Sequence, residues 1–258
     1  MLRGGSCQMK LHYRKTGAGG KTQTSIVFLH GAGGSSTLFG NQFQAFREFA
    51  TCYFLDLPGH GGSLHPIETP SIELYAEEAA HFIDYLPAPA VLIGHSMGGA
   101  VALSVALSNP DLIQYLILAG TGCRLAVSDK ILTGLETDYE STVEKILRYC
   151  FSRSVDPELF ARARDEVRKV DPDIVRADFR ACNVYDCCNR LTEIKVPTLI
   201  ICGDNDVMTP LALSQQLQNS ISGARLHVIP GGSHMLVLEG PAEFNTIIRD
   251  RLLELGSS

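Results

Sequence analysis

A serine between two glycines is the first feature of this 258-residue sequence that could carry out chemistry. Ser96 lies in Gly94-His95-Ser96-Met97-Gly98-Gly99, after the apolar run Val91-Leu92-Ile93 and before a helical pattern that begins at Ala100. A sharp strand-to-helix turn strains the serine backbone, and the glycines on either side let neighbouring backbone approach without a Cβ clash. The hydroxyl then lies at a helix N-terminus, where developing negative charge is favoured. The pattern predicts that Ser96 is a nucleophile.

A serine hydroxyl needs a base to take its proton and an acid to orient that base, and both occur downstream. Gly231-Gly232-Ser233-His234 follows an apolar run that ends at Ile229, and Gly203-Asp204-Asn205-Asp206 follows one that ends at Cys202. Open α/β sheets build their sites where parallel strands end. His234 is therefore the predicted base, and Asp204 and Asp206 are both candidates for the acid. The other histidines considered, His12, His81 and His227, are interpreted as surface or strand residues.

The elements that must position these residues alternate along the chain. Apolar strand-like runs occur at Met9–Arg14, Ser25–His30, Cys52–Asp56, Ala90–Gly94, Tyr115–Gly120, Thr198–Gly203 and Arg225–Pro230. Helical patterns lie between or after them at Leu38–Ala50, Ser71–Leu86, Met97–Ser108, Leu211–Asn219 and Pro241–Leu255. Most strand runs are continuously apolar, as is typical of strands covered on both faces. The order predicts an α/β fold with a mostly parallel sheet and helices on both faces.

One segment departs from this alternation. Residues 124–190 contain no strand-like run, but Ser141–Phe151, Pro157–Val170 and Pro172–Tyr185 have helical patterns. We expect a helical insertion at 124–190 in a core domain made of residues 1–123 and 191–258. No internal repeat or long linker is apparent.

These motifs resemble those of the α/β-hydrolase superfamily over residues 9–255. In the family pattern the acid lies three residues after a glycine and four before a proline, which points to Asp206 and leaves Asp204 to cap the loop. Glu239 and Pro241 after His234 also match the histidine loop of the family. The resemblance implies the Ser-Asp-His order of catalytic residues and a cap formed by the helical insertion.

The resemblance also assigns structural turns. His30-Gly31-Ala32-Gly33-Gly34 matches the loop whose backbone amide binds the oxyanion, which implies donors at Ala32 and Met97, with Gly33 as an alternative to Ala32. Asp56 begins a turn, Asp-Leu-Pro-Gly-His-Gly-Gly-Ser, in which it is expected to bind backbone amides, and His30 is expected to hold its loop. The residues proposed to line a substrate pocket are His95, Tyr149, Phe151 and Met235.

A serine hydrolase that cleaves a small or medium carboxylic ester through an acyl-enzyme is the favoured function. The Gly-His-Ser-Met-Gly-Gly segment resembles esterases and monoglyceride lipases. Hydrolases of carbon-carbon bonds in ring-fission diketones share the fold, but usually have asparagine and tryptophan where this chain has His95 and Met235. A lyase similar to menaquinone-pathway enzymes and a receptor-like binding protein with negligible turnover remain alternatives.

The composition of the chain argues against two classes of partner. The net charge is −6 and no basic run occurs, so neither nucleic acid nor an anionic membrane surface is expected as a partner. The N-terminus lacks the apolar region of a signal peptide, and no stretch is long enough to span a membrane. We expect a cytoplasmic protein with a small-molecule ester substrate and no metal or organic cofactor. The oligomeric state stays open.

The eight cysteines are interpreted as packing thiols rather than a disulfide framework. They are Cys7, Cys52, Cys123, Cys150, Cys182, Cys187, Cys188 and Cys202.

Overall fold

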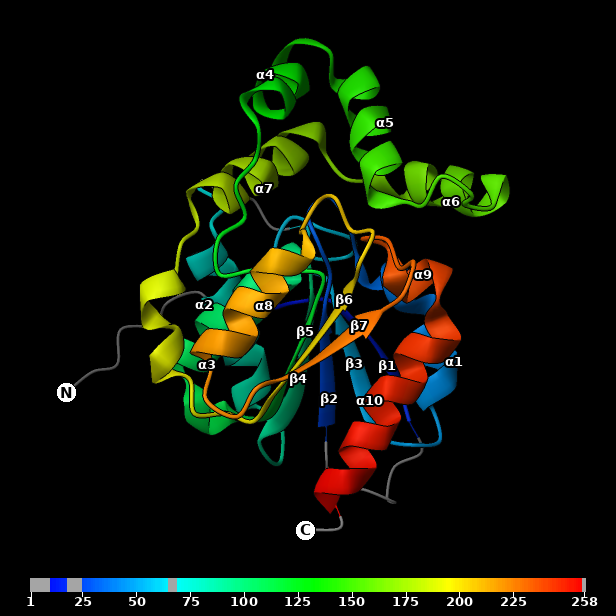
Figure 1. Ribbon diagram of the computed structural model, residues 1–258. Coiled ribbons are helices and arrows are strands. Elements are labelled where there is room, and N and C mark those ends of the chain that lie inside the picture. The colour runs from blue at the N-terminus through cyan, green and yellow to red at the C-terminus, as the bar shows by residue number, and fades with distance from the viewer. Residues whose placement is uncertain (1–9, 18–24, 65–68, 257–258) are drawn as a thin grey trace, which may run out of the picture.

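A seven-stranded sheet runs through the centre of the protein, whose computed structural model describes residues 10–17, 25–64 and 69–256. The strand order is β1-β3-β2-β4-β5-β6-β7, with β1 antiparallel to β3 and every other neighbouring pair parallel (Figure 1). The strands are β1 (Tyr13–Thr16), β2 (Ser25–Leu29), β3 (Thr51–Leu55), β4 (Ala90–His95), β5 (Ile113–Ala119), β6 (Thr198–Gly203) and β7 (Arg225–Ile229). The predicted mainly parallel sheet is confirmed.

The burial of each strand explains its sequence pattern. All residues of β2, β4 and β6 are buried, because helices cover both faces of the sheet there. The two edge strands, β1 and β7, alternate between more and less exposed positions instead. β1 also begins later than predicted, at Tyr13, where its pairing with Leu55 of β3 starts. The start of that prediction, Met9, lies outside the described residues.

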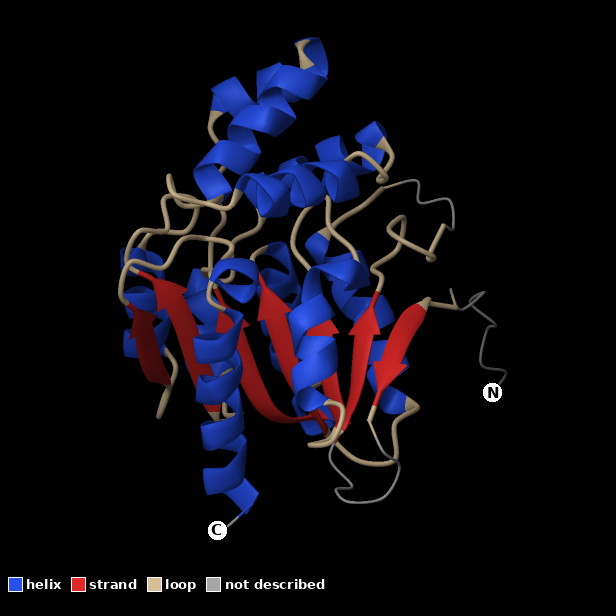
Figure 2. Ribbon diagram, turned by 90° about the vertical axis from the view of Figure 1, so that its right-hand side faces the viewer, coloured by secondary structure: helices blue, strands red, loops and turns tan. Residues whose placement is uncertain are grey.

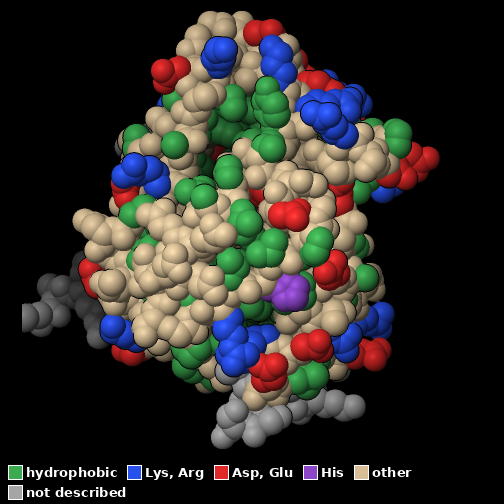
Figure 3. Space-filling view, viewed as in Figure 1, with side chains coloured by type: hydrophobic (Ala, Val, Ile, Leu, Met, Phe, Trp, Pro, Cys, Tyr) green, Lys and Arg blue, Asp and Glu red, His purple; other side chains and the backbone are tan. Residues whose placement is uncertain are grey.

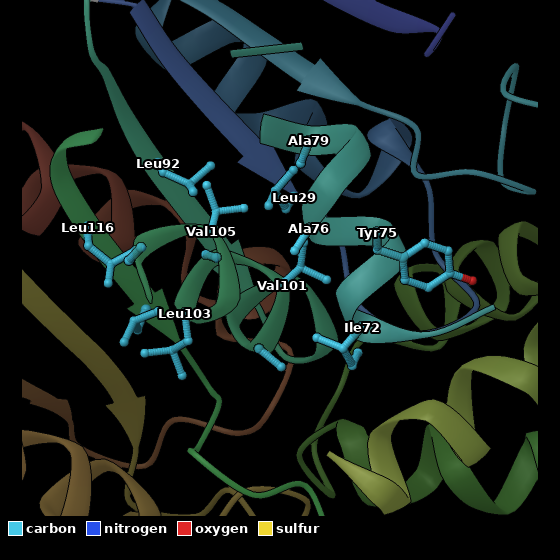
Figure 4. Close-up of a cluster of buried hydrophobic side chains, with 14 of the residues drawn as sticks. Leu29, Ile72, Tyr75, Ala76, Ala79, Leu92, Val101, Leu103, Val105 and Leu116 are labelled. Atoms are coloured by element: carbon cyan, nitrogen blue, oxygen red, sulfur yellow. The ribbon is translucent and has the colours of Figure 1, made fainter. Parts of the chain in front are cut away.

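Two helical layers enclose the sheet (Figure 2). α2 (Ile72–Asp84), α3 (Met97–Ser108) and α8 (Leu211–Ser220) cover one face. Figure 4 shows part of the apolar cluster that α2 and α3 form with the central strands. α1 (Gly40–Phe46), α9 (Leu236–Glu239) and α10 (Pro241–Gly256) cover the other face. Short 3₁₀ helices lie at Ser36–Phe39, Pro110–Leu112 and Cys188–Glu193. Within the described residues, no helix is long and apolar enough to cross a bilayer.

Residues 124–190, called the helical insertion below, lie above the ends of the central strands (Figures 1 and 2). The insertion contains α4 (Asp129–Thr137), α5 (Tyr139–Cys150), α6 (Pro157–Val167) and α7 (Pro172–Val184), which share an apolar cluster of their own. Asp156 and Asp171 cap α6 and α7, each followed by a proline at the first helical position. α4 was not predicted; its N-cap is Ser128, whose side chain accepts from the Ile131 amide.

A disulfide between Cys123 and Cys188 closes the base of the insertion. The interpretation of these two cysteines as free packing thiols is therefore wrong. They lie 65 residues apart in the sequence and meet because the chain, after the insertion, returns to the place where it left the core. The described free cysteines, Cys52, Cys150, Cys182, Cys187 and Cys202, are all buried. Cys7 lies outside the described residues.

Candidate active site

Ser96 occupies the turn between β4 and α3 with φ 55° and ψ −120°. In the described part of the chain it is the single non-glycine residue with positive φ. Such a conformation persists only where the surroundings enforce it. A Cβ at Gly94 would lie 2.1 Å from the oxygen of Gly98, and a Cβ at Gly98 would lie 2.2 Å from the oxygen of Leu29. Glycine is therefore required on both sides of Ser96 for α3 to start so close to the sheet.

The side chains of Ser96, His234 and Asp206 form one hydrogen-bonded chain. Nε2 of His234 is 2.9 Å from Ser96 Oγ, and Nδ1 of His234 is 2.8 Å from Asp206 Oδ2. The three residues follow β4, β7 and β6, whose C-terminal ends lie at the same edge of the sheet. This arrangement allows His234 to take a proton from the serine while the carboxylate stabilises the imidazolium that results.

The Asp206 carboxylate is held as an anion. Burial alone would raise its pKa, but His234 and hydrogen bonds from Thr209 lower the pKa below its ordinary value. Oδ1 accepts from the amides of Met208 and Thr209, both at 2.8 Å, and Oδ2 accepts from the Thr209 hydroxyl at 2.6 Å. Asp206 can therefore orient His234 without becoming protonated itself.

Asp204 has a different role from Asp206. Its Oδ1 accepts a hydrogen bond from the Gly231 amide at 2.6 Å, which ties the loop after β6 to the loop after β7. This contact fits the predicted loop-capping role of Asp204. The hydrogen bonds thus distinguish Asp206, which contacts His234, from Asp204, which contacts Gly231. The residue pattern alone left both as candidates for the acid.

His95 lies beneath the site rather than in the hydrogen-bonded chain. Its Nε2 donates to the carbonyl oxygen of His234 at 2.9 Å, and the two rings are 5.0 Å apart. Its other ring nitrogen, Nδ1, is buried and has no partner among the described residues. Burial, assisted by the neighbouring His234, lowers the pKa of His95 to about 3, so the ring is neutral near pH 7.

The predicted oxyanion donors lie beside Ser96. A Cβ at Gly31 would lie 3.1 Å from Ser96 Cβ, which brings the loop after β2 against the serine. The backbone amides of Ala32 and Met97 have no hydrogen-bond partner within the described structure. The Gly33 amide, in contrast, donates to Asp178 Oδ2 at 2.8 Å. Of the two alternatives in this loop, Ala32 has the amide left for a substrate.

A cavity of about 340 Å³ opens between these loops and the helical insertion. Figure 3 shows hydrophobic side chains gathered in the hollow between α4, α5 and α7. Ser96, His95, His234 and Met235 line the cavity from the core. Its apolar wall includes Leu125, Val127, Val143, Ile146, Leu147, Leu159, Val167, Val175, Phe179, Met208 and Leu238. The volume lies within the range of small-molecule sites.

Two predicted pocket residues do not line this cavity. The Tyr149 side chain is at the surface, 54% exposed, because it lies on the outer side of α5. Phe151 is buried, but its ring packs edge-on against Phe160, with the centroids 5.7 Å apart. The prediction was wrong for both. His95 and Met235, also predicted, do line the cavity.

The sequence reasoning missed Thr209 and Asp178. Thr209 was detectable in principle, since it lies three residues after Asp206, the spacing at which a carboxylate binds the backbone of its own turn. Asp178 gave no local signal, because its partners are 103, 118 and 145 residues away.

Comparison with known proteins places this geometry in a family. Residues 26–247 match the sequence profile of the Alpha/beta hydrolase family. A pimeloyl-[acyl-carrier protein] methyl ester esterase of Nitrosomonas europaea is 29% identical over 91% of this chain and 96% of its own length. A 2-hydroxy-6-oxononadienedioate/2-hydroxy-6-oxononatrienedioate hydrolase of Paraburkholderia phymatum is 29% identical over 98% of this chain and 93% of its own. The solved structure of a thermophilic esterase has 31% identity and a TM-score of 0.82, covering 96% of this chain and 99% of that chain.

The chain belongs to the Alpha/beta hydrolase family. The relatives and the fold support assigning it as a hydrolase of the esterase-like type.

Proposed function

We propose that this protein is a serine esterase that hydrolyses small to medium carboxylic esters with an apolar acyl group. The observation that carries the proposal is the hydrogen-bonded chain from Ser96 through His234 to Asp206, with steps of 2.9 and 2.8 Å, at the floor of an apolar cavity. The esterase relatives support the same reaction class.

In the proposed reaction, Ser96 Oγ attacks the ester carbonyl carbon while His234 Nε2 takes the hydroxyl proton. The carbonyl oxygen becomes negative, and the amides of Ala32 and Met97 stabilise it. His234 then gives its proton to the leaving alcohol, and an acyl group remains on Ser96. Water attacks this acyl-enzyme by the same route, which releases the carboxylic acid and restores the serine hydroxyl.

The cavity wall determines which esters fit. Its helical-insertion side includes aliphatic side chains such as Val143, Leu147 and Val175, which favour a hydrocarbon acyl chain over a polar one. Arg162 and Glu166 also line it, and the Arg162 guanidinium is 3.9 Å from Glu158. We expect the acyl chain to lie among the aliphatic residues.

Carbon-carbon bond hydrolysis is the second candidate, because one relative is named for it. The substrate in that name is a dicarboxylate, which would need cationic groups in the cavity. Among the described residues that line it, Arg162 is the single Lys or Arg side chain, and that side chain is 69% exposed. The apolar wall therefore favours an ester with an apolar acyl group.

A panel of p-nitrophenyl esters from acetate to laurate, run beside a ring-fission diketone, tests the proposal. We expect ester turnover that falls by more than about a thousandfold in Ser96→Ala. Ser104→Ala is the matched control, since Ser104 lies on α3 but donates to the Tyr185 hydroxyl away from the cavity. A fluorophosphonate probe should label Ser96. Labelling of another serine, turnover of the diketone alone, or tight ligand binding without turnover would overturn the esterase assignment.

A further inference from the structure

A buried carboxylate of the helical insertion reaches into the loop that contains the predicted oxyanion donor. Asp178 lies on α7 and its side chain is fully buried. Oδ2 accepts from the Gly33 amide and from His60 Nε2, each at 2.8 Å, and Oδ1 accepts from the Tyr75 hydroxyl at 2.7 Å. Asp178 thus joins the insertion to the loop after β2, the turn after β3 and helix α2.

The contacts of His60 favour its charged form. Its Nδ1 faces the carbonyl oxygen of Pro58 at 3.0 Å and its Nε2 faces Asp178, which is the arrangement of an imidazolium that donates from both nitrogens. Burial alone would lower the pKa of His60, but the Asp178 carboxylate and these hydrogen bonds raise it overall. The neutral His30 ring is 4.8 Å away. Asp178 and His60 are therefore a buried ion pair with no net charge.

Tyr75 completes the surroundings of the carboxylate. Figure 4 shows its ring leaving α2 with the oxygen directed away from the apolar cluster. Burial and the negative charge of Asp178 raise the pKa of the tyrosine, so the hydroxyl stays protonated and donates. The three donors satisfy the carboxylate, which a fully buried anion requires.

The loop that Asp178 holds adopts a specific turn. The Gly34 amide donates to the Gly31 carbonyl at 3.1 Å, and Gly33 has φ +64°. A Cβ at Gly33 would lie 3.4 Å from Val175 of α7, one helical turn before Asp178. The helix therefore packs directly on this glycine. With the Gly33 amide turned toward α7, the preceding amide, that of Ala32, is left without a protein partner.

We propose that Asp178 is a positioning residue for the oxyanion hole: by holding the Gly33 amide, it fixes the Ala32 amide in the orientation that binds the negative oxygen. The inference rests on the proposed ester hydrolysis. It makes the helical insertion part of the catalytic apparatus, since one of its side chains determines where a donor in the core points. A donor that is not fixed in advance stabilises the transition state less, because it must reorganise during the reaction.

Asp178→Asn tests the inference with little change in volume. Without its counter-charge, the buried His60 ring becomes neutral, and its Nε2 accepts a hydrogen bond instead of donating one. The Asn amide group must then take the position of Oδ2, where its N–H faces the Gly33 N–H, and the Gly33 contact is lost. We expect kcat on a p-nitrophenyl ester to fall by about 10- to 100-fold, with KM changed by less than about threefold. Affinity for a trifluoromethyl ketone, which forms an oxyanion on Ser96, should fall by a similar factor.

Tyr75→Phe is the matched control. It removes a hydrogen bond to the same carboxylate in the same buried setting, but Tyr75 donates to Oδ1, whereas Gly33 is bound by Oδ2. We expect a lower melting temperature with kcat within about threefold of the wild type, because only stability is affected. Equal losses of kcat and of ketone affinity in both variants would reduce Asp178 to a structural role. Wild-type kcat in a folded Asp178→Asn protein would also overturn the inference.

One measurement needs no variant. Hydrogen exchange of the Gly33 amide in the wild-type protein should be as slow as that of buried backbone amides, although Gly33 lies in a loop. Exchange at the rate of exposed loops would contradict the inference even if Asp178→Asn failed to fold. Failure of the esterase proposal is distinct, since it would appear in the wild type as absent ester turnover and no fluorophosphonate labelling of Ser96.

Discussion

The Nε2 atom of His95 donates a hydrogen bond to the carbonyl oxygen of His234, 2.9 Å away. The residue directly before the proposed nucleophile therefore supports the backbone of the proposed base. This contact links the turn after β4 to the loop after β7 without using either ring nitrogen of His234, which face Ser96 and Asp206.

Loss of this contact should impair turnover. His95→Ala removes the donor and leaves a cavity under His234, and we expect kcat to fall by at least about tenfold because the base is less well placed. His95→Gln retains an N–H donor at a similar distance along the side chain and should recover most of the activity. Steady-state kinetics of both variants test this. Equal rates in Ala and Gln variants would show that the hydrogen bond does not matter.

The two carboxylates after β6 should behave differently. Asp206→Asn removes the anion that orients His234, and we expect kcat to fall by about 10³- to 10⁴-fold with the fold retained. Asp204→Asn is the matched control, because the Asp204 side chain binds the Gly231 amide in the adjoining turn rather than His234. Circular dichroism checks the fold and ester kinetics check the roles. A large loss in Asp204→Asn with little loss in Asp206→Asn would reverse the assignment.

Acid should destabilise the protein before its carboxylates titrate. Burial, with a smaller effect of His60, lowers the pKa of His30 to about 4, and His95 has a pKa of about 3. Both bind protons in the unfolded chain below about pH 6.5. Between about pH 6.5 and the folded-state pKa of each histidine, the unfolded state binds more protons than the folded state. The free energy of unfolding therefore falls as the pH decreases, by up to about 1.4 kcal/mol per pH unit for each histidine. His60, whose pKa is raised, acts in the opposite sense and contributes less as pH rises above 6.5.

Urea unfolding between pH 7 and 4.5 measures this slope, in a range above the ordinary pKa of aspartate. His95→Gln cannot take up the proton and should flatten the slope by the share of one histidine. An unfolding free energy that stayed constant over this range would contradict the assignment of His30 and His95 as buried neutral groups.

Filling the cavity from the insertion should change the acyl preference. Leu159 is partly buried and lines the cavity, so Leu159→Trp shortens the space available to the acyl chain. We expect kcat/KM for the longest accepted ester to fall by about tenfold or more, with acetate little affected. Tyr149→Phe, at an exposed position outside the cavity, is the control and should retain the wild-type profile. An unchanged profile in Leu159→Trp would place the acyl chain elsewhere.

Much of the fold could be predicted because its signals are local. The continuous apolar runs of β2 and β4 reflect burial on both faces, and the glycines around Ser96 reflect a backbone that admits no Cβ. Side-chain direction on amphipathic helices was harder to predict. Tyr149 and Phe151 are aromatic and are close in the sequence to residues that line the cavity. Tyr149 nevertheless faces solvent, and Phe151 packs on Phe160.

Interactions between distant segments that belong to no recognised motif could not be predicted. The Cys123–Cys188 disulfide and the contacts of Asp178 depend on where the helical insertion returns to the core, which no spacing in the sequence encodes. The choice between Asp204 and Asp206 needed either a family pattern or the observed hydrogen bonds, since both carboxylates follow the same strand.

The two ends of the helical insertion lie close together at its base. The α-carbons of Cys123 and Cys188 are 4.9 Å apart, and the Cys187 amide donates to the Cys123 carbonyl at 2.9 Å. The chain thus leaves the core and re-enters it at the same place. We therefore expect that a segment of different length or shape could replace the helical insertion without moving a strand of the sheet. On the proposed positioning role of Asp178, such a segment would also need a carboxylate that holds the Gly33 amide.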